Sequence, residues 1–518
     1  MKSNFIISIF IIFVISSCDK QSSDLMDISQ SVTNISEVAG LSDVELALTR
    51  QAVIGKKLPN PYSIDVMNEA LNNLKTKSDI GDFELRATHH YIMFKPECHE
   101  HYRSLIMQDD IDLNSFPLDH EISSGWVVVN PDPAFSTNGY SHKWSYVPVE
   151  RDLSDINCPY EILYDIVSLD EETTATKGTD TSQEMFRLIE EEAHSLCGME
   201  LEIVPQTKAK TTPYGNIKYY DSSYGKEVGC SGMTVRAHRL TKKAYGHCDD
   251  NGNFTCDKDF TYKWTYTIFW GRTDFEIRDG IDSKEQISLV FTNQDGPLYL
   301  NFNSLNYPDH MFHCEILRAA CKYFYGEIDG LNRPPFKDEL KDRIYIQAVK
   351  GRDTGGSNGF FSYVSQLNSL PYIRIFKNDA NSNNKMPAAE IYFNTIHEIA
   401  HSAHWKVNPS LYYNNCHTKV KESFASGVGM HLTRKVHPTF SWEYWGNYTG
   451  VVEDLIDNDG LTSHSSVRYS ENVSGFTIRE IEKSIEGATT WNGWRDNIIS
   501  MYPYNPSISN VNSLFTVW

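Results

Sequence analysis

The stretch Ala388–Trp405, AAEIYFNTIHEIAHSAHW, contains two histidines four positions apart, His397 and His401, with Glu398 directly after the first. Residues four apart lie one above the other on the same face of a helix. A helix here would therefore present both imidazoles to one metal ion. The alternative is a helix whose solvent-facing histidines bind nothing.

The residues around the two histidines predict a strand followed by a helix. Ala388–Phe393 predicts a short strand, and Asn394 or Thr395 would cap the helix after it. Apolar side chains at helical spacing predict its buried stripe: Ile396, Ile399, Ala400 and Ala403.

His397-Glu398-x-x-His401 is the H-E-x-x-H arrangement of zinc-dependent peptidases. Zinc accepts neutral imidazole nitrogens, and a catalytic zinc keeps one position open for water beside three protein ligands. Glu398 would take a proton from that water as the water attacks a carbonyl. The motif therefore predicts a Zn²⁺ site with Glu398 as general base.

The third ligand has three candidates. Seven residues of helix place His404 about 10 Å along the axis from His397, too far to share an ion with it. A metzincin would need Gly at position 404 and His at position 407, where this chain has His404 and Val407. Glu422 begins a second helical pattern about twenty residues beyond His401, and a carboxylate there would complete the ligand set.

His397, Glu398 and His401, followed by Glu422 in an E-S-F-A context, resemble the core of the gluzincins, the group of zinc peptidases that includes thermolysin. The resemblance implies a zinc ion held by His397, His401 and Glu422. Thermolysin-like enzymes often carry an Asp four residues after the glutamate ligand, where this chain has Ser426. The group that orients the liganding histidine is therefore left unassigned.

The resemblance also implies a tyrosine that stabilises the oxyanion formed when water adds to the carbonyl. Thermolysin-like enzymes place it between the two helices, where this chain has Tyr412 and Tyr413. Tyr448 and His431 are the alternatives.

The wider chain resembles an uncharacterised family of Bacteroidetes lipoproteins that carry this motif near the C-terminus. The resemblance rests on five segments: Gly55–Tyr62, Ala87–Tyr91, Phe116–His120, Tyr448–Asp457 and Val473–Thr477.

The first 17 residues predict a lipoprotein signal peptide, with Lys2 followed by the apolar run Phe5–Ile15. Ile15-Ser-Ser-Cys18 resembles a lipobox, so Cys18 would be the lipidated first residue of the mature chain. We therefore expect a bacterial envelope protein that meets the membrane through its lipid anchor only. We expect the outer membrane or cell surface, although Asp19 retains lipoproteins in the inner membrane of some bacteria.

The remaining sequence predicts a multidomain α+β protein. Residues 18–40 are rich in polar residues and predict a tether, and residues 41–203 predict a mixed α/β domain. Residues 204–296 alternate aromatic and β-branched residues and predict a small β-sandwich. Residues 297–518 would form a zincin-like catalytic domain.

Within the predicted sandwich, Gly232–His238 and Asp249–Phe254 resemble the carboxypeptidase-regulatory-like module of secreted enzymes. It would bind substrate or glycan, or would act only as a spacer. In the predicted catalytic domain, Met311–Tyr325 predicts a helix, and Arg343–Val349 and Tyr372–Phe376 predict strands. Gluzincins bind the extended substrate along an edge strand, and Tyr372–Phe376 is the candidate for it.

The composition of the chain limits the kinds of partner that it can bind. The formal charge of −21 over 518 residues argues against nucleic acid and against broad binding to anionic membrane surfaces. The ten cysteines include Cys18, which leaves an odd number for disulfides. Buried free thiols are therefore the default prediction.

The sequence thus predicts a lipid-anchored zinc metallopeptidase that cleaves extracytoplasmic polypeptides or glycoproteins. One alternative is an inactive envelope binding or scaffold lipoprotein with a vestigial zinc site, which uses the β-sandwich for protein or glycan binding. Another is an amide or ester hydrolase that uses the same zinc chemistry.

Overall fold

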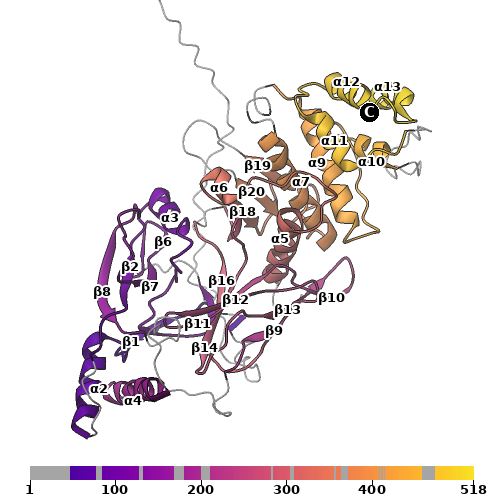
Figure 1. The fold of residues 1–518 in the computed structure, drawn as a ribbon. Helices are drawn as coiled ribbons and strands as arrows, with labels where there is room; N and C mark the ends of the chain where they lie inside the picture. The colour runs from indigo at the N-terminus through magenta and orange to yellow at the C-terminus, as the bar shows by residue number, and fades with distance from the viewer. Residues whose placement is uncertain are drawn as a thin grey trace, which may run out of the picture. The chain divides into compact units, whose positions relative to one another are not determined.

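A four-stranded mixed sheet lies beside the helix that carries His397 and His401 (Figure 1). The computed structural model of the protein describes residues 47–48, 50–77, 84–127, 132–168, 180–199, 210–281, 284–303, 308–354, 357–362, 372–407, 409, 412, 415–457 and 473–518. The strands of this sheet are β15 (Phe275–Asp279), β18 (Ile344–Val349), β19 (Gly359–Ser362) and β20 (Tyr372–Phe376). In the order β15-β18-β20-β19, the first three are parallel and β19 is antiparallel.

The predicted strands at 343–349 and 372–376 are confirmed as β18 and β20. The prediction that Tyr372–Phe376 is an edge strand is wrong, because β20 pairs with β18 on one side and β19 on the other. The edge strands among the described residues are β15 and β19, and β19, which pairs only with β20, is the one that contacts α7. Its four residues are too short a run to give a periodic signal in the sequence.

Helix α7 (Ala388–Val407) begins earlier than the sequence predicts. Ala388–Phe393 is the first part of this helix, so the strand predicted there is wrong. Asn394 and Thr395 are buried inside the helix and do not cap it. Nearly every residue of α7 up to His404 is buried, and a continuously apolar run does not distinguish a strand from a buried helix.

The cap of α7 comes from a distant part of the chain. The amides of Ala388 and Ala389 donate hydrogen bonds to the hydroxyl oxygens of Ser222 and Ser223, at 3.0 and 2.8 Å. These partners are 166 residues apart in the sequence, so no local pattern indicates the true start of the helix. The two serines satisfy amides that a helix N-terminus leaves without intrahelical partners.

Helix α7 packs between α5 (Pro308–Tyr325), which confirms the predicted helix, and α9 (Thr418–Arg434). Two glycines allow α9 to approach its neighbours closely. A Cβ built on Gly429 would lie 2.8 Å from the ring of Phe393 on α7, and one on Gly427 would lie 2.2 Å from Val452 of α10 (Val451–Ile456).

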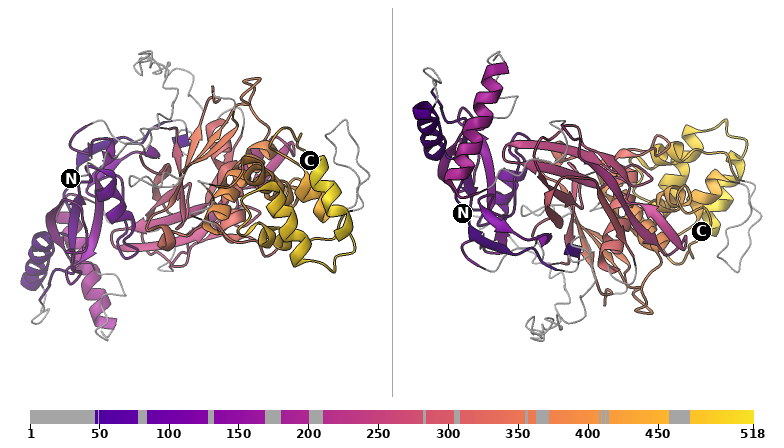
Figure 2. Two further views of the ribbon diagram at one scale, coloured as in Figure 1. Left: turned by 90° about the horizontal axis from the view of Figure 1, so that it is seen from above. Right: turned by 90° about the horizontal axis from the view of Figure 1, so that it is seen from below.

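The other helices of the C-terminal half are α6 (Lys337–Leu340), α11 (Ile478–Ile485), α12 (Trp491–Met501), the 3₁₀ turn η3 (Ile508–Asn510) and α13 (Val511–Val517). Helices α10, α11 and α12 each contact α9, and Figures 1 and 2 show them gathered beside it. They cover the side of α9 that α7 does not occupy, so α9 is enclosed by other helices.

Two further sheets are built mainly from antiparallel strands. One has the order β12 (Lys242–His247), β11 (Thr234–Arg239), β14 (Trp264–Phe269), β16 (Ser288–Gln294), β4 (Gly125–Val127). The other has the order β10 (Lys226–Gly229), β9 (Tyr214–Asp221), β13 (Asn253–Thr255), and β17 (Leu298–Phe302) pairs with β9 in parallel. Buried side chains of both sheets and of α5 and α7 belong to one hydrophobic cluster.

Strand pairing crosses both of the predicted inner domain boundaries. Strand β4 lies before position 203 and pairs with β16 after it. Strand β15 lies before position 296, yet it is paired in parallel with β18, which lies after it. The described residues accordingly belong to one compact unit with a mixed α/β fold.

The N-terminal part of the described chain contains a sheet of order β7-β2-β8 and two helices packed on each other, α2 and α4. The bounds of its elements are β1 (Ile54–Lys57), α2 (Ile64–Lys77), β2 (His89–Phe94), α3 (His99–Ile106), β3 (His120–Ile122), β5 (Ser136–Thr137), β6 (Tyr140–Ser141), β7 (Lys143–Pro148), β8 (Tyr160–Ile166) and α4 (Asp180–Leu196). Small separate hydrophobic clusters stabilise this part.

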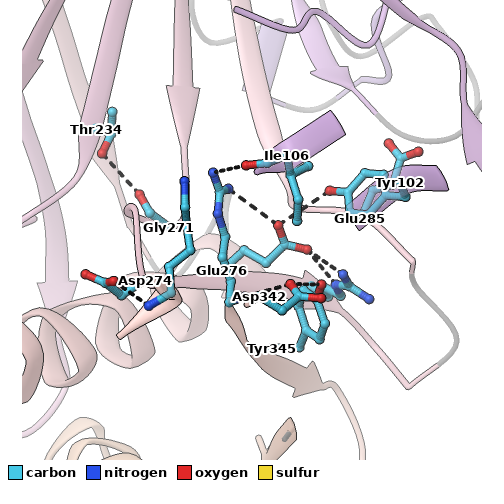
Figure 3. Close-up of polar contacts among 12 residues, drawn as sticks. Tyr102, Ile106, Thr234, Gly271, Asp274, Glu276, Glu285, Asp342 and Tyr345 are labelled. Atoms are coloured by element: carbon cyan, nitrogen blue, oxygen red, sulfur yellow. Dashed lines mark hydrogen bonds and ion pairs between the residues drawn. The ribbon is translucent and has the colours of Figure 1, made fainter. Parts of the chain in front are cut away.

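A buried ionic network joins α3 to the sheet of β15, β18, β20 and β19 (Figure 3). The carboxylate of Glu276 on β15 is fully buried and lies 2.6 Å from a guanidinium nitrogen of Arg278. The Tyr102 hydroxyl of α3 donates to Glu276 at 3.4 Å, and the Arg343 guanidinium lies 3.8 Å from it. These cationic partners compensate the negative charge of Glu276, which would otherwise be costly to bury.

The predicted signal peptide, Cys18 and the tether lie outside the described residues. Among the residues that the structure describes, no helix is both long enough and apolar enough to cross a bilayer. The nine cysteines in the described ranges are free thiols, and seven of them are buried.

We expect Gly427→Ala to lower the free energy of unfolding by about 1–3 kcal/mol, because the new methyl group would overlap Val452. This sign is the reverse of the usual effect of Gly→Ala inside a helix, which stabilises by about 1 kcal/mol. Chemical denaturation measures the difference. Gly296→Ala is the control, since a Cβ there meets nothing within 4 Å. A Gly427→Ala protein as stable as the parent would contradict the close approach of α9 and α10.

Candidate metal centre

Helix α7 brings the two imidazoles of the motif together. The Nε2 atoms of His397 and His401 lie 3.1 Å apart, and both side chains are buried. The sequence-based prediction of a helix at this position is confirmed, and its i, i+4 spacing produces the pairing.

Helix α9 adds a carboxylate to this pair. Glu422 Oε2 lies 3.2 Å from His397 Nε2 and 3.2 Å from His401 Nε2. The three atoms form a nearly equilateral triangle. Ligands of a tetrahedral zinc ion with bonds of about 2.0–2.1 Å lie about 3.3–3.4 Å from one another, so the triangle is within a few tenths of an ångström of that spacing. The donor set of two imidazoles and one carboxylate fits a divalent metal ion.

His404 does not belong to this group, in agreement with the sequence argument. Its ring packs edge-on against Tyr412 and Phe424, at 4.9 and 5.4 Å between ring centroids. Burial lowers the pKa of His404 to about 3, so the ring is neutral and acts as an apolar packing group.

Each histidine of the triangle has a hydrogen-bond partner at its other ring nitrogen. The Tyr412 hydroxyl lies 2.8 Å from His401 Nδ1, and the Ser426 hydroxyl lies 3.4 Å from His397 Nδ1. With Nε2 turned toward the triangle, each Nδ1–H donates to the oxygen beside it, which fixes the ring orientation. Ser426 thus occupies the position of the Asp found in thermolysin-like enzymes.

The charges and burial within the triangle favour the ionised form of Glu422 beside the two imidazoles. Burial alone would raise the pKa of Glu422, but His401 and His397 outweigh it and hold that pKa far below its ordinary value. Burial would lower the pKa of His401, but Glu422 outweighs it and raises that pKa. Burial lowers the pKa of His397. Glu422 is therefore ionised and able to bind a cation.

Glu398 lies against the edge strand and is not part of the triangle. A Cβ built on Gly359 of β19 would lie 2.5 Å from Glu398 Oε1, so the carboxylate packs directly on the strand backbone. Burial raises the pKa of Glu398 to about 8. A carboxylate held at this position can accept a proton near neutral pH.

A cavity of about 320 Å³ opens beside the cluster. His397, Glu398 and Gly359 lie on its wall, and Tyr448 closes it from the segment before α10. Aromatic side chains form much of the remaining lining: Phe393, Phe440, Trp442 and Trp445. A substrate group in this cavity would lie next to both the metal ligands and the carboxylate of Glu398.

The four candidates for oxyanion stabilisation are in different places. Tyr413 lies outside the described residues, and the hydroxyl of Tyr412 is held at His401 Nδ1. His431 lies elsewhere, with its imidazole 2.6 Å from Asp329. Tyr448 lines the cavity, and burial together with the nearby charges of Glu422 and Glu398 raises its pKa. Among the candidates that the structure describes, Tyr448 is therefore the one whose side chain lines the cavity, and its hydroxyl is hydrogen-bonded to Glu422.

Sequence reasoning missed Gly359 and the serines that cap α7. A single glycine after a glycine-rich loop has no distinguishing signal, and its role arises only from the contact with Glu398. Tyr448 was considered only as an alternative, because 29 tyrosines give no way to select one by position.

The chain was compared with models of known protein families and with curated protein sequences. No family model matches it, and no curated protein does.

Tyr412→Phe should weaken metal binding by about 10–100-fold, because His401 loses the hydroxyl that orients its ring. Competition with a chromogenic chelator measures the affinity for Zn²⁺. Tyr504→Phe, at a side chain that is 96% exposed, is the matched control and should bind as the parent does. Equal affinities for all three proteins would remove Tyr412 from the support of the site.

Proposed function

We propose that this chain is a gluzincin-type zinc metallopeptidase, with His397, His401 and Glu422 as the metal ligands. The observation that carries the proposal is the triangle of two imidazole nitrogens and one carboxylate oxygen, with sides of 3.1 to 3.2 Å. Spacing in sequence suggested these three residues, and their contact in the folded chain supports the same ligand set.

Zinc at this position would supply a Lewis acid that polarises the scissile carbonyl and lowers the pKa of water. Glu398 takes the proton from the attacking water and passes it to the leaving amine. Tyr448 donates a hydrogen bond to the oxygen on which negative charge develops. Burial supports these roles, since electrostatic interactions are stronger where water is excluded.

The substrate would bind as an extended polypeptide along β19. This strand pairs with β20 on one side only among the described residues, so its other edge can accept a peptide strand. Gly359 lies on β19 and touches Glu398, which places the edge next to the general base. The cavity lined by Trp442 and Trp445 would then receive a side chain of that peptide.

The same proposal assigns a role to each part of the fold. The sheet of β15, β18, β20 and β19 with α5, α7 and α9 would be the zincin-like catalytic region. The two sheets that share a core correspond to the proposed β-sandwich. Lipid attachment at Cys18 would place the enzyme at the bacterial cell envelope, where extracytoplasmic proteins or glycoproteins are available as substrates.

A second candidate is an inactive binding lipoprotein, and two further cavities favour it. They measure about 360 and 610 Å³ and lie where the N-terminal part meets the sheet of β11 and β14. Ligand binding there would need no hydrolysis. The placement of Glu398 and Tyr448 beside the metal ligands favours the enzyme. An amide or ester hydrolase would use the same residues, and only substrate tests separate it from a peptidase.

Glu398→Ala should retain the metal and lose hydrolysis by at least the roughly 10²–10⁴-fold that a general base contributes. A quenched fluorescent peptide library measures turnover, and elemental analysis measures bound zinc. His401→Ala should lose both. Glu486→Gln, at an exposed glutamate in the same half of the chain, is the control. An unchanged cleavage rate in Glu398→Ala would eliminate the mechanism, and stoichiometric zinc without turnover in the parent would favour the binding lipoprotein.

Tyr448→Phe should lower kcat by about 10²–10³-fold, as removal of one oxyanion donor does, while KM and zinc content change little. Steady-state kinetics on the best peptide separates kcat from KM. Tyr412→Phe in the same assay should recover its activity at high zinc concentration, because its hydroxyl acts through His401. A Tyr448→Phe protein with full kcat would assign the oxyanion to another group.

A further inference from the structure

A second group of metal-ligating side chains lies away from the triangle. Asp221, Glu315 and His437 offer ligand atoms that all lie within 4.8 Å of one another. Their relative exposures are 0, 2 and 3%, so the group is fully enclosed. Asp221 ends β9, Glu315 lies on α5, and His437 follows the end of α9. Three segments far apart in sequence therefore meet at one buried point.

Two of these side chains lack hydrogen bonds. Neither carboxylate oxygen of Glu315 and neither ring nitrogen of His437 makes a hydrogen bond of ordinary geometry. A buried carboxylate without a partner is costly, and buried charges in proteins are normally paired or bind metals. Tyr219 acts on Glu315 as a hydrogen-bond donor outside that geometry. Glu315 at one oxygen at least and His437 at both nitrogens therefore still present ligand atoms to the group.

The other charged groups at this point do not balance the two carboxylates. Asp221 Oδ1 accepts hydrogen bonds from the amides of Ser223 and Tyr224, while Oδ2 faces the group. Arg318 Nη1 lies 3.4 Å from Asp221 Oδ2 and donates to the Tyr219 hydroxyl at 3.2 Å. Arg318 and, more weakly, Lys385 are the cations that act on Glu315, but burial and the charge of Asp221 outweigh them and raise the pKa of Glu315 to about 8.

The imidazole is positioned to complete a ligand set. His437 Nε2 lies 3.8 Å from Asp221 Oδ2. Its ring stacks on Tyr224 and meets Tyr392 of α7 edge-on, at 4.9 and 5.5 Å between centroids, which fixes its orientation. Oriented imidazole nitrogen with carboxylate oxygens is a donor set that suits zinc and manganese.

We propose that Asp221, Glu315 and His437 form a second metal site, which binds a divalent transition-metal ion in a structural role. The site joins the end of β9 to α5 and to the segment after α9. Ser222 and Ser223, directly after Asp221, cap the helix that carries the catalytic histidines. An ion here would therefore hold the cap of α7 and the far end of α9 in one arrangement.

The test uses the full mature chain with the catalytic ligands removed, so that only the second site can bind. His397→Ala/His401→Ala protein is stripped with a chelator, reloaded with Zn²⁺ or Mn²⁺, and desalted. We expect about one ion per chain by elemental analysis and a rise in Tm on reloading. Adding Glu315→Gln and His437→Gln should abolish both effects. His431→Gln is the matched control, because that imidazole pairs with Asp329 outside the group.

Binding of neither metal by the His397→Ala/His401→Ala protein would overturn the proposal. Retention of the ion after Glu315→Gln and His437→Gln would do so as well, because the ion would then lie elsewhere. Circular dichroism checks that each variant is folded. If the variant with all four substitutions does not fold, Co²⁺ is loaded into the His397→Ala/His401→Ala protein instead. Absorption bands of cobalt bound by nitrogen and oxygen ligands would support the site, and their absence would contradict it.

Discussion

The close contact between α7 and α9 is the constraint on which the candidate centre depends. His397 and His401 lie on one helix and Glu422 on the other, so the separation of the helices sets whether three ligand atoms can meet. Gly429 permits that separation, because its missing side chain leaves room for the ring of Phe393. A glycine inside a helix costs about 1 kcal/mol relative to alanine, and close packing offsets this cost.

The same two helices are fixed at their far ends by the rest of the chain. The turn after β9 caps α7 through Ser222 and Ser223, and the segment after α9 returns to Asp221 through His437. The β sheets thus act on the candidate centre by holding the helices that carry it. The proposed structural ion would lie where these constraints meet, which connects the stability of the β sheets to the geometry of His397, His401 and Glu422.

The sequence predicts those features that depend on residues close together in the chain. His397 and His401 were predictable because helix periodicity alone brings them together, and β18 and β20 because each is a short segment rich in β-branched and aromatic residues. Glu422 was found through the gluzincin resemblance. The start of α7, the role of Gly359 and the Asp221 group could not be predicted, because each depends on contacts between segments far apart in the chain. The edge position of β19 likewise depends on the order of strands in the sheet.

The parallel pairing of β15 with β18 has a consequence for how this architecture can be inherited. Strand β15 of the four-stranded sheet lies in the segment that precedes residue 297, so a gene fragment beginning there would encode a sheet in which β18 has a bare edge. Such an edge invites pairing with other chains. Recombination that exchanged only the C-terminal portion would therefore be disfavoured, and the segments before and after residue 297 would be expected to pass between genomes as a single block.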